Sequence, residues 1–128
     1  MIYLDTSVAL AELFAEDRRP APAFWAGRLA SSRLLEYELW TRIHARGAAR
    51  SHGEAARELL SRIAFVELSS QVLARALDPW PRPVRTLDAL HLSTALFLVE
   101  RRRPVEFATY DERLGRAAEA LGLRAASA

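Results

Sequence analysis

The 128-residue sequence contains no cysteine, no lysine and no asparagine. Without cysteine, the chain forms no disulfide and offers no thiolate ligand to a metal ion. Without lysine, it cannot carry out Schiff-base chemistry or bind phosphate through a P-loop. Contacts to phosphate fall instead to arginine, whose planar guanidinium binds two oxygens at once. These absences exclude several classes of enzyme before any motif is considered.

Long hydrophobic runs are also missing. No apolar stretch is long enough to span a bilayer, and no basic residues precede the short apolar segment at the N-terminus. We therefore expect no membrane anchor, no signal peptide and a cytoplasmic location. The charge is nearly balanced, with 18 basic and 16 acidic residues, and every one of those basic residues is arginine. A hydrophobic content of 51% and a charged content of 27% are typical of a globular protein.

Short strands alternate with helices along the chain. The pattern predicts strands at 2–5, 64–68, 104–110 and 123–126, with a weak strand or turn at 31–34. It predicts helices at 7–17, 21–30, 35–48, 51–63, 69–77, 86–103 and 111–122, with Ser51 as a cap and with stops at Gly47 and Gly122. Such alternation indicates one α/β domain, residues 1–128, with a mainly parallel sheet covered on both faces. The carboxyl ends of its strands meet at one edge, where ligands bind in such folds.

Four carboxylates are expected near that edge: Asp5, Glu38, Asp88 and Asp111. Asp5 and Asp111 follow strands, Asp88 lies in the first turn of the long apolar helix, and Glu38 lies on the helix after the second strand. Each has an ordinary explanation when taken alone. Asp5 can cap the next helix, Asp88 and Asp111 can stabilise the positive ends of helix dipoles, and Glu38 can pair with Arg42.

Taken together, the four acids indicate more than helix capping and ion pairs. Carboxylates gathered at one sheet edge repel each other, and without a cation some of them would be forced to hold protons. A hard divalent cation with oxygen ligands removes that repulsion. Because the set contains only Asp and Glu, it favours Mg²⁺ or Mn²⁺ over zinc.

Four motifs carry a resemblance to a known family: "YLDTS", "LLEYELWTR", "RTLDALHLSTA" and "FATYDERLGRAA". In order and spacing they resemble the motifs of PIN-domain ribonucleases, and they are most similar to the VapC toxins of toxin–antitoxin pairs. The resemblance implies a PIN-like three-layer α/β/α fold and a Mg²⁺- or Mn²⁺-dependent endoribonuclease. It also implies an RNA substrate, a cognate VapB-like antitoxin and a homodimer. Carried over motif by motif, it makes Asp5, Glu38, Asp88 and Asp111 the catalytic and metal-binding residues.

The second acid of this set has a competitor, because the same helix offers Glu36 as well as Glu38. We prefer Glu38, whose distance from the preceding Ser-Ser pair fits the family pattern better.

Supporting roles are predicted for three residues. Thr109 would orient the acidic site, although a β-former in a strand explains it equally well. Thr6 and Ser7 can each donate to a carboxylate or a phosphate, or cap the first helix, and we prefer capping for Ser7. Arg85 precedes the Asp88 helix and is the better placed of the nearby arginines to bind a phosphate of the substrate. His91, three residues after Asp88, could be a general acid or a ligand, but we expect a packed histidine bonded to a neighbour.

The expected reaction is hydrolysis of an RNA phosphodiester by a metal-activated water, which leaves a 5′-phosphate and a 3′-hydroxyl. Two other functions compete with it. A catalytically inactive PIN-fold module that binds RNA or regulates would keep the fold without the chemistry. A phospho-receiver domain also places an aspartate after a strand, but it needs a lysine that this chain lacks.

Overall fold

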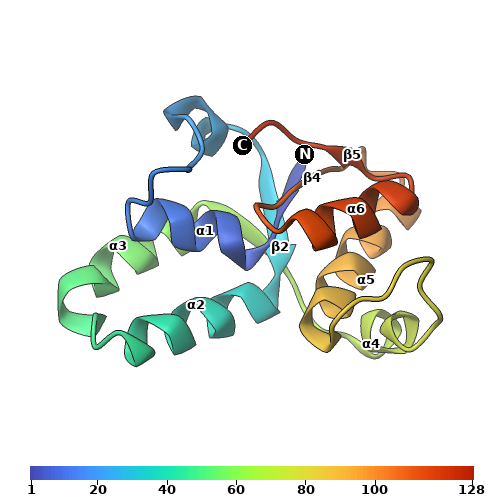
Figure 1. Ribbon diagram of the computed structural model, residues 1–128, viewed down its shortest axis with the longest axis horizontal. Helices are drawn as coiled ribbons and strands as arrows, with labels where there is room; N and C mark the ends of the chain where they lie inside the picture. Colours follow the sequence, from blue (N-terminus) through green and yellow to red (C-terminus); the bar gives the residue numbers. More distant parts are fainter.

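A five-stranded sheet, in the order β3-β2-β1-β4-β5, separates two groups of helices (Figure 1). The computed structural model describes all 128 residues. The strands are β1 (Ile2–Leu4), β2 (Leu29–Ser32), β3 (Ile63–Val66), β4 (Glu106–Ala108) and β5 (Arg124–Ala125). Central β1 pairs Tyr3 with Ala30 of β2 and with Phe107 of β4. Every pairing is parallel, so the expected α/β architecture is confirmed.

Each face of the sheet has its own hydrophobic core. The helices are α1 (Thr6–Leu13), α2 (Arg33–Ala45), α3 (Ala49–Ser61), α4 (Ser70–Ala76), α5 (Thr86–Glu100) and α6 (Glu112–Ala120). Leu4 points into the core shared with α1, α2 and α3. Tyr3 points into the core shared with α5 and α6, and α4 packs against α5. Neighbouring strand residues face opposite sides, which is why residues 3 and 4 enter different cores.

The largest departure from expectation lies between residues 21 and 34. The predicted helix at 21–30 is wrong: a short 3₁₀ helix, η1 (Pro22–Ala26), is followed by β2 from Leu29 onward. Leu29 pairs with Ile2 and is buried in the sheet. Pairing with β1 therefore overrides the local helical pattern, as tertiary context commonly does.

Helix ends follow the backbone conformation of single residues. Gly47 and Gly122 end α2 and α6 with φ of 62° and 83°, as predicted. The first and fifth helices end three or four residues earlier than predicted, because Ala15 and Arg102 adopt φ of 49° and 60°. Ser51 is not a cap, since α3 already begins at Ala49.

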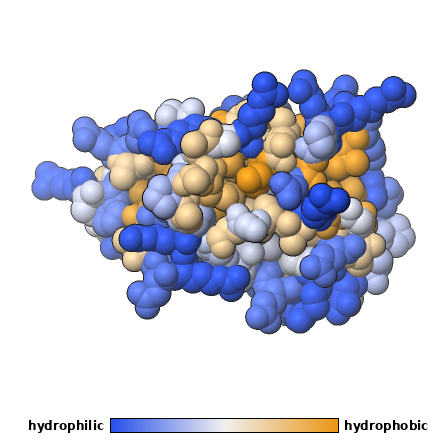
Figure 2. All heavy atoms as spheres, turned by 90° about the horizontal axis from the view of Figure 1, so that it is seen from above, coloured by the Kyte–Doolittle hydropathy of each residue, from blue (hydrophilic) through white to orange (hydrophobic).

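Both chain ends lie at the edge where the strands begin (Figure 1). Figure 2 looks onto this edge and shows apolar side chains across the middle, surrounded by hydrophilic ones. Asp5 follows the opposite end of β1, and the loop that carries Asp111 follows the same end of β4. None of the helices combines the length and the apolar character needed to cross a membrane.

Candidate active site

Asp5 is the most buried of the four predicted acids, with 5% of its surface exposed. Ser7 Oγ donates to its Oδ1 at 2.6 Å, and Thr109 Oγ1 donates to its Oδ2 at 2.7 Å. Burial raises the pKa of the Asp5 carboxyl, and the hydrogen bonds from Ser7 and Thr109 lower it without cancelling the effect of burial. The chain therefore holds a carboxylate rigidly in a place where its charge is unfavourable.

Helix capping alone does not explain Asp5. The residue occupies the N-cap position of α1 without a well-formed capping hydrogen bond, and the backbone N–H of Val8 lowers its pKa less than Ser7 and Thr109 do. The prediction that Thr6 or Ser7 takes over the cap is also wrong, because both lie inside α1. Their hydroxyls donate to Glu38 and Asp5 instead. The first helix thus begins without a side-chain cap, and its hydroxyl residues serve the acids.

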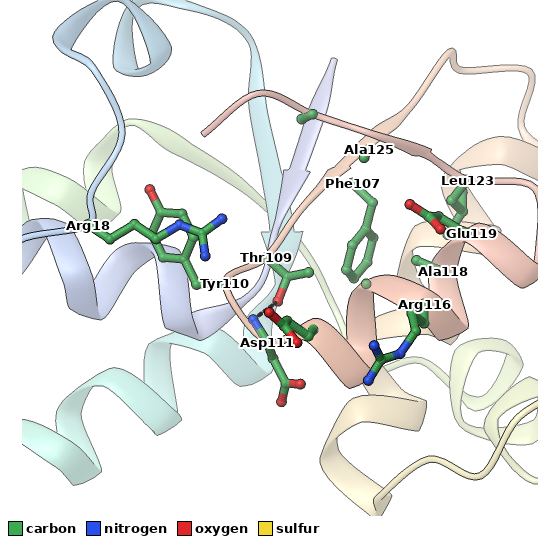
Figure 3. A pocket seen from close by; sticks show the side chains of 13 residues that line it. Arg18, Phe107, Thr109, Tyr110, Asp111, Arg116, Ala118, Glu119, Leu123 and Ala125 are labelled. Carbon is green, nitrogen blue, oxygen red and sulfur yellow. Dashed lines mark hydrogen bonds between the residues drawn. The ribbon is translucent and has the colours of Figure 1, made fainter.

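Thr109 joins two of the acids. Its hydroxyl donates to Asp5 and accepts the backbone N–H of Asp111 at 3.0 Å, the contact drawn in Figure 3. Ser7 accepts the backbone N–H of Tyr110 at 2.9 Å and lies 3.5 Å from Thr109. This loop before α6 is therefore fastened to the end of β1 by side-chain hydroxyls. Thr109 lies just beyond β4, which is shorter than the predicted strand at 104–110.

Asp111 uses its two oxygens differently. Oδ1 accepts the backbone N–H groups of Arg113 and Leu114, so the side chain caps α6 as an ordinary N-cap would. Oδ2 accepts Arg85 Nη2 at 2.9 Å. The same guanidinium lies 3.3 Å from Oδ2 of Asp88 through its Nε. Arg85, predicted to bind substrate phosphate, here bridges two carboxylates.

Glu38 receives two hydrogen bonds on one oxygen. Thr6 Oγ1 donates to Oε1 at 2.6 Å, and His91 Nε2 lies 2.7 Å from the same atom. Burial raises the pKa of the Glu38 carboxyl. The hydrogen bond and the charge interaction with His91, together with the hydrogen bond from Thr6, outweigh burial and leave the pKa below its usual value. Glu36 instead lies 3.4 Å from Arg33, outside this network.

One residue of the network escaped the sequence reasoning. Tyr3 is fully buried, and its hydroxyl lies 2.7 Å from Nδ1 of His91. A buried tyrosine usually finds a hydrogen-bond partner, which was the only available signal. For Ser7 capping was preferred over donation to a carboxylate, but its hydroxyl donates to Asp5. His91 is 2% exposed and bonded on both ring nitrogens, which confirms the expectation of a packed, bonded histidine.

A hollow of about 390 Å³ borders the loop that carries Thr109 and Asp111 (Figure 3). Arg18 lies over the ring of Tyr110, 4.7 Å from its centre, on one side of this hollow, and Arg116 lies on the other. Phe107 and small residues of α6 line it as well. Asp5, Glu38 and Asp88 do not line this hollow, so it meets the acidic site only at Thr109 and Asp111.

The donor set fits a hard divalent cation. All four acids offer oxygen, and no sulfur ligand exists in the chain. No three carboxyl or imidazole groups stand close enough to hold an ion as they are arranged. The Arg85 guanidinium supplies positive charge between Asp88 and Asp111. The oxygen ligands that Mg²⁺ or Mn²⁺ prefers are therefore present, and Arg85 lies between two of them.

Comparison with known proteins agrees with this architecture. The PIN domain profile matches residues 2–120. The chain is 34% identical to Ribonuclease VapC47 of Mycobacterium tuberculosis (strain CDC 1551 / Oshkosh) over 121 residues, 89% of this chain and 87% of the relative. It is also 34% identical to Ribonuclease VapC35 from the same strain, over 129 residues, covering 96% and 93% of the two chains. The protein belongs to the PIN-domain family, within its VapC ribonuclease group.

Solved structures share the fold at lower sequence identity. VapC20 of Mycobacterium tuberculosis, a toxin that cleaves the sarcin–ricin loop, superposes with a TM-score of 0.69 at 20% identity, covering 91% of this chain and 95% of that one. A toxin–antitoxin complex from Klebsiella pneumoniae gives a TM-score of 0.64 at 20% identity, covering 87% of each chain. These likenesses support the three-layer α/β/α fold.

Proposed function

We propose that this protein is an endoribonuclease toxin that uses Mg²⁺ or Mn²⁺ held by Asp5, Glu38, Asp88 and Asp111. The curated relatives at 34% identity are named ribonucleases. The observation that carries the metal dependence is Asp5, a buried carboxylate fixed by two hydroxyls although burial raises its pKa. A divalent cation offsets the unfavourable charge there.

When bound, a divalent ion polarises a phosphoryl oxygen and makes water a better nucleophile. The protein's own part is to present oxygens at fixed positions. Ser7 and Thr109 orient both oxygens of Asp5. One oxygen each of Glu38 and Asp111 is held by hydrogen bonds, on Oε1 and Oδ1. The other oxygen of Glu38 has no partner, and that of Asp111 is bound by Arg85 alone.

Arg85 is proposed to leave its carboxylates when cation and substrate arrive, and to bind an RNA phosphate. Its side chain is 68% exposed, so it can move without disturbing the core. Arginine binds phosphate through paired hydrogen bonds. The same residue would thus neutralise the acids at rest and hold the substrate during cleavage.

The direct test is cleavage of RNA by the purified protein with Mg²⁺, with Mn²⁺ and with EDTA. Cleavage is expected with either cation and is lost in EDTA. Asp88→Asn should lower the rate by about 10²-fold or more, since removal of a group that stabilises transition-state charge has that effect. Glu36→Gln serves as the control, because Glu36 lies outside the network. Wild-type rates for Asp88→Asn would refute the mechanism.

A catalytically inactive RNA-binding module is the second candidate, and one observation favours it. Arg85 forms ion pairs with two of the four acids, and no three potential ligands are close enough together to hold a metal ion. This candidate predicts RNA binding without cleavage, and no change in melting temperature on addition of Mn²⁺. The cleavage assay and a thermal shift assay with Mn²⁺ separate the two functions.

We also propose two assemblies, one with an antitoxin and one between two copies of this chain. A VapB-like antitoxin is supported by the toxin–antitoxin complex that shares the fold. A homodimer is supported by exposed apolar side chains on α4, just after α4 and on α5: Leu73 at 42%, Leu77 at 87% and Leu87 at 46% exposure. We propose that residues 1–128 act as one domain in the cytoplasm, where RNA is available and no disulfide is needed. Light scattering of the protein alone and with the antitoxin tests both assemblies.

A further inference from the structure

A buried chain of polar groups crosses from β1 to the acidic site. It starts at the backbone N–H of Ser32, which donates to Tyr3 Oη at 3.2 Å. Tyr3 Oη and His91 Nδ1 are 2.7 Å apart, and His91 Nε2 and Glu38 Oε1 are also 2.7 Å apart. Tyr3 and His91 are 0% and 2% exposed. Water therefore has no access to the middle of this chain.

The hydrogen bond between His91 and Glu38 has a fixed direction. An ionised carboxylate only accepts hydrogen bonds, so His91 Nε2 must carry a hydrogen to bond Glu38. The other ring nitrogen, Nδ1, bonds the Tyr3 hydroxyl, and Tyr3 Oη also accepts the Ser32 N–H. Both ring nitrogens of His91 are therefore held by named partners.

The hydrogen bonds from His91 and Thr6 leave the two oxygens of Glu38 in different environments. Both donors, His91 and Thr6, meet at Oε1, and Thr6 Oγ1 lies 3.4 Å from His91 Nε2, so the three groups form a closed triangle. Oε2 has no hydrogen-bond partner. One oxygen is therefore anchored and the other is free for a cation or for water.

We propose that His91 and Tyr3 are positioning residues, which hold Glu38 through Oε1 so that Oε2 is presented to the metal ion and substrate. His91 donates to Glu38 from Nε2, and Tyr3 holds the imidazole ring through Nδ1. The catalytic meaning of this arrangement rests on the proposed function, whereas the hydrogen-bond directions do not. Ordinary core packing does not account for the arrangement, because an apolar side chain would fill the same space without bonding Glu38.

Two amide variants form a matched test. His91→Gln places an amide N–H near the position of Nε2, whereas His91→Asn stops near Nδ1 and cannot reach Glu38. Loss of a residue that orients a metal ligand typically costs about 10- to 100-fold in metal affinity or activity. We expect His91→Asn to weaken Mn²⁺ binding, measured by calorimetry, and cleavage by this amount, and His91→Gln to restore most of both. His44→Asn, an exposed histidine on α2, is the control. Equal values for the two His91 amides would overturn the proposal.

The wild-type protein provides a second measurement, which does not depend on the folding of a variant. Nitrogen-15 NMR of the metal-free protein should show a proton on Nε2 of His91. A His91 ring without a proton on Nε2 would overturn the proposal.

The outcomes also separate the two proposals. If the wild type cleaves RNA and His91→Asn cleaves equally well, the positioning role fails and the proposed function stands. The wild type could instead cleave no RNA and still carry a proton on His91 Nε2, with His91→Asn binding Mn²⁺ more weakly. In that case the positioning role stands and the proposed function fails.

Discussion

Arg85 Nη2 donates to Asp111 Oδ2 at 2.9 Å, although 26 residues separate them in the sequence. The other oxygen of Asp111 caps α6, so Oδ2 is the atom that Asp111 can offer to a cation. Arg85 also reaches Asp88. A metal ion and Arg85 therefore compete for the same oxygens, and the affinity for metal reflects that competition.

Replacing the arginine should separate its two proposed roles. Arg85→Gln removes the competing cation, and an exposed ion pair is worth at most about 1 kcal/mol, so Mn²⁺ should bind about 3- to 5-fold more tightly. RNA cleavage should fall about 10-fold or more at saturating Mn²⁺, because a charge-assisted contact to phosphate is lost. Calorimetry and a cleavage assay measure the two effects. Arg82→Gln, in the same loop, is the control, and unchanged Mn²⁺ affinity in Arg85→Gln would count against the competition.

Asp5 should make the metal-free protein less stable at neutral pH. Its folded-state pKa lies above the ordinary value of 3.8, so the folded protein binds this proton more tightly than the unfolded chain does. The stability that Asp5 contributes is thus fully present below pH 3.8 and is lost as pH rises through the raised pKa. Asp5→Asn should raise the free energy of unfolding at pH 7 by about 1–3 kcal/mol, since removing an unfavourable buried charge has effects of that size.

Thermal unfolding from pH 3 to pH 8 checks this prediction. The gap between Asp5→Asn and wild type should open as pH rises and close at low pH. Added Mn²⁺ should stabilise the wild type alone and so reduce the difference in melting temperature between the two proteins. EDTA should restore that difference. Asp17→Asn, an exposed substitution on the loop after α1, is the control. A gap that widens toward acid would mean that Asp5 is stabilising as an anion.

Much of the architecture could be predicted from the sequence, because it depends on local signals. Alternating apolar runs indicated most of the strands, and Gly47 and Gly122 marked two helix ends through their left-handed conformation. The second strand was placed two residues late because it is specified by pairing with Ile2 and Tyr3 rather than by its own residues. Ala15 and Arg102 gave no signal, since neither residue type favours positive φ.

The four acids of the site could be predicted from the sequence for a different reason. A carboxylate after a strand or in a first helical turn is visible in the sequence, and parallel strands gather such residues at one edge. Of the partners that orient them, Thr6 and Thr109 were predicted with the help of the family resemblance, but the bond between Tyr3 and His91, across 88 residues, was not. Side-chain hydrogen bonds between distant elements leave no periodic pattern.

Thr109 should matter through its hydroxyl rather than its shape. Thr109→Val keeps the volume but removes the donor to Asp5 and the acceptor for the Asp111 N–H. A lost hydrogen bond to a charged group costs about 1.5–3 kcal/mol, so the melting temperature should fall by several degrees and Mn²⁺ affinity should fall with it. Thr109→Ser should recover most of both. Equal behaviour of the Val and Ser variants would assign Thr109 to strand packing alone.

The two glutamates of α2 offer the closest matched pair in the chain. Glu38→Gln keeps the size of the side chain and an oxygen that can accept from Thr6 and His91, but it removes the negative charge and places an NH2 group where Oε2 stands. Cleavage should fall by about 10²-fold, as expected for loss of an electrostatic group at a reacting centre. Glu36→Gln, one half-turn away beside Arg33, should cleave within about 2-fold of wild type, since an exposed ion pair contributes little. Steady-state cleavage of one RNA by both variants, at saturating Mn²⁺, makes the comparison. A reversed order would make Glu36 the second acid, and it would require α2 to present a different face to the site from the one that bonds Thr6.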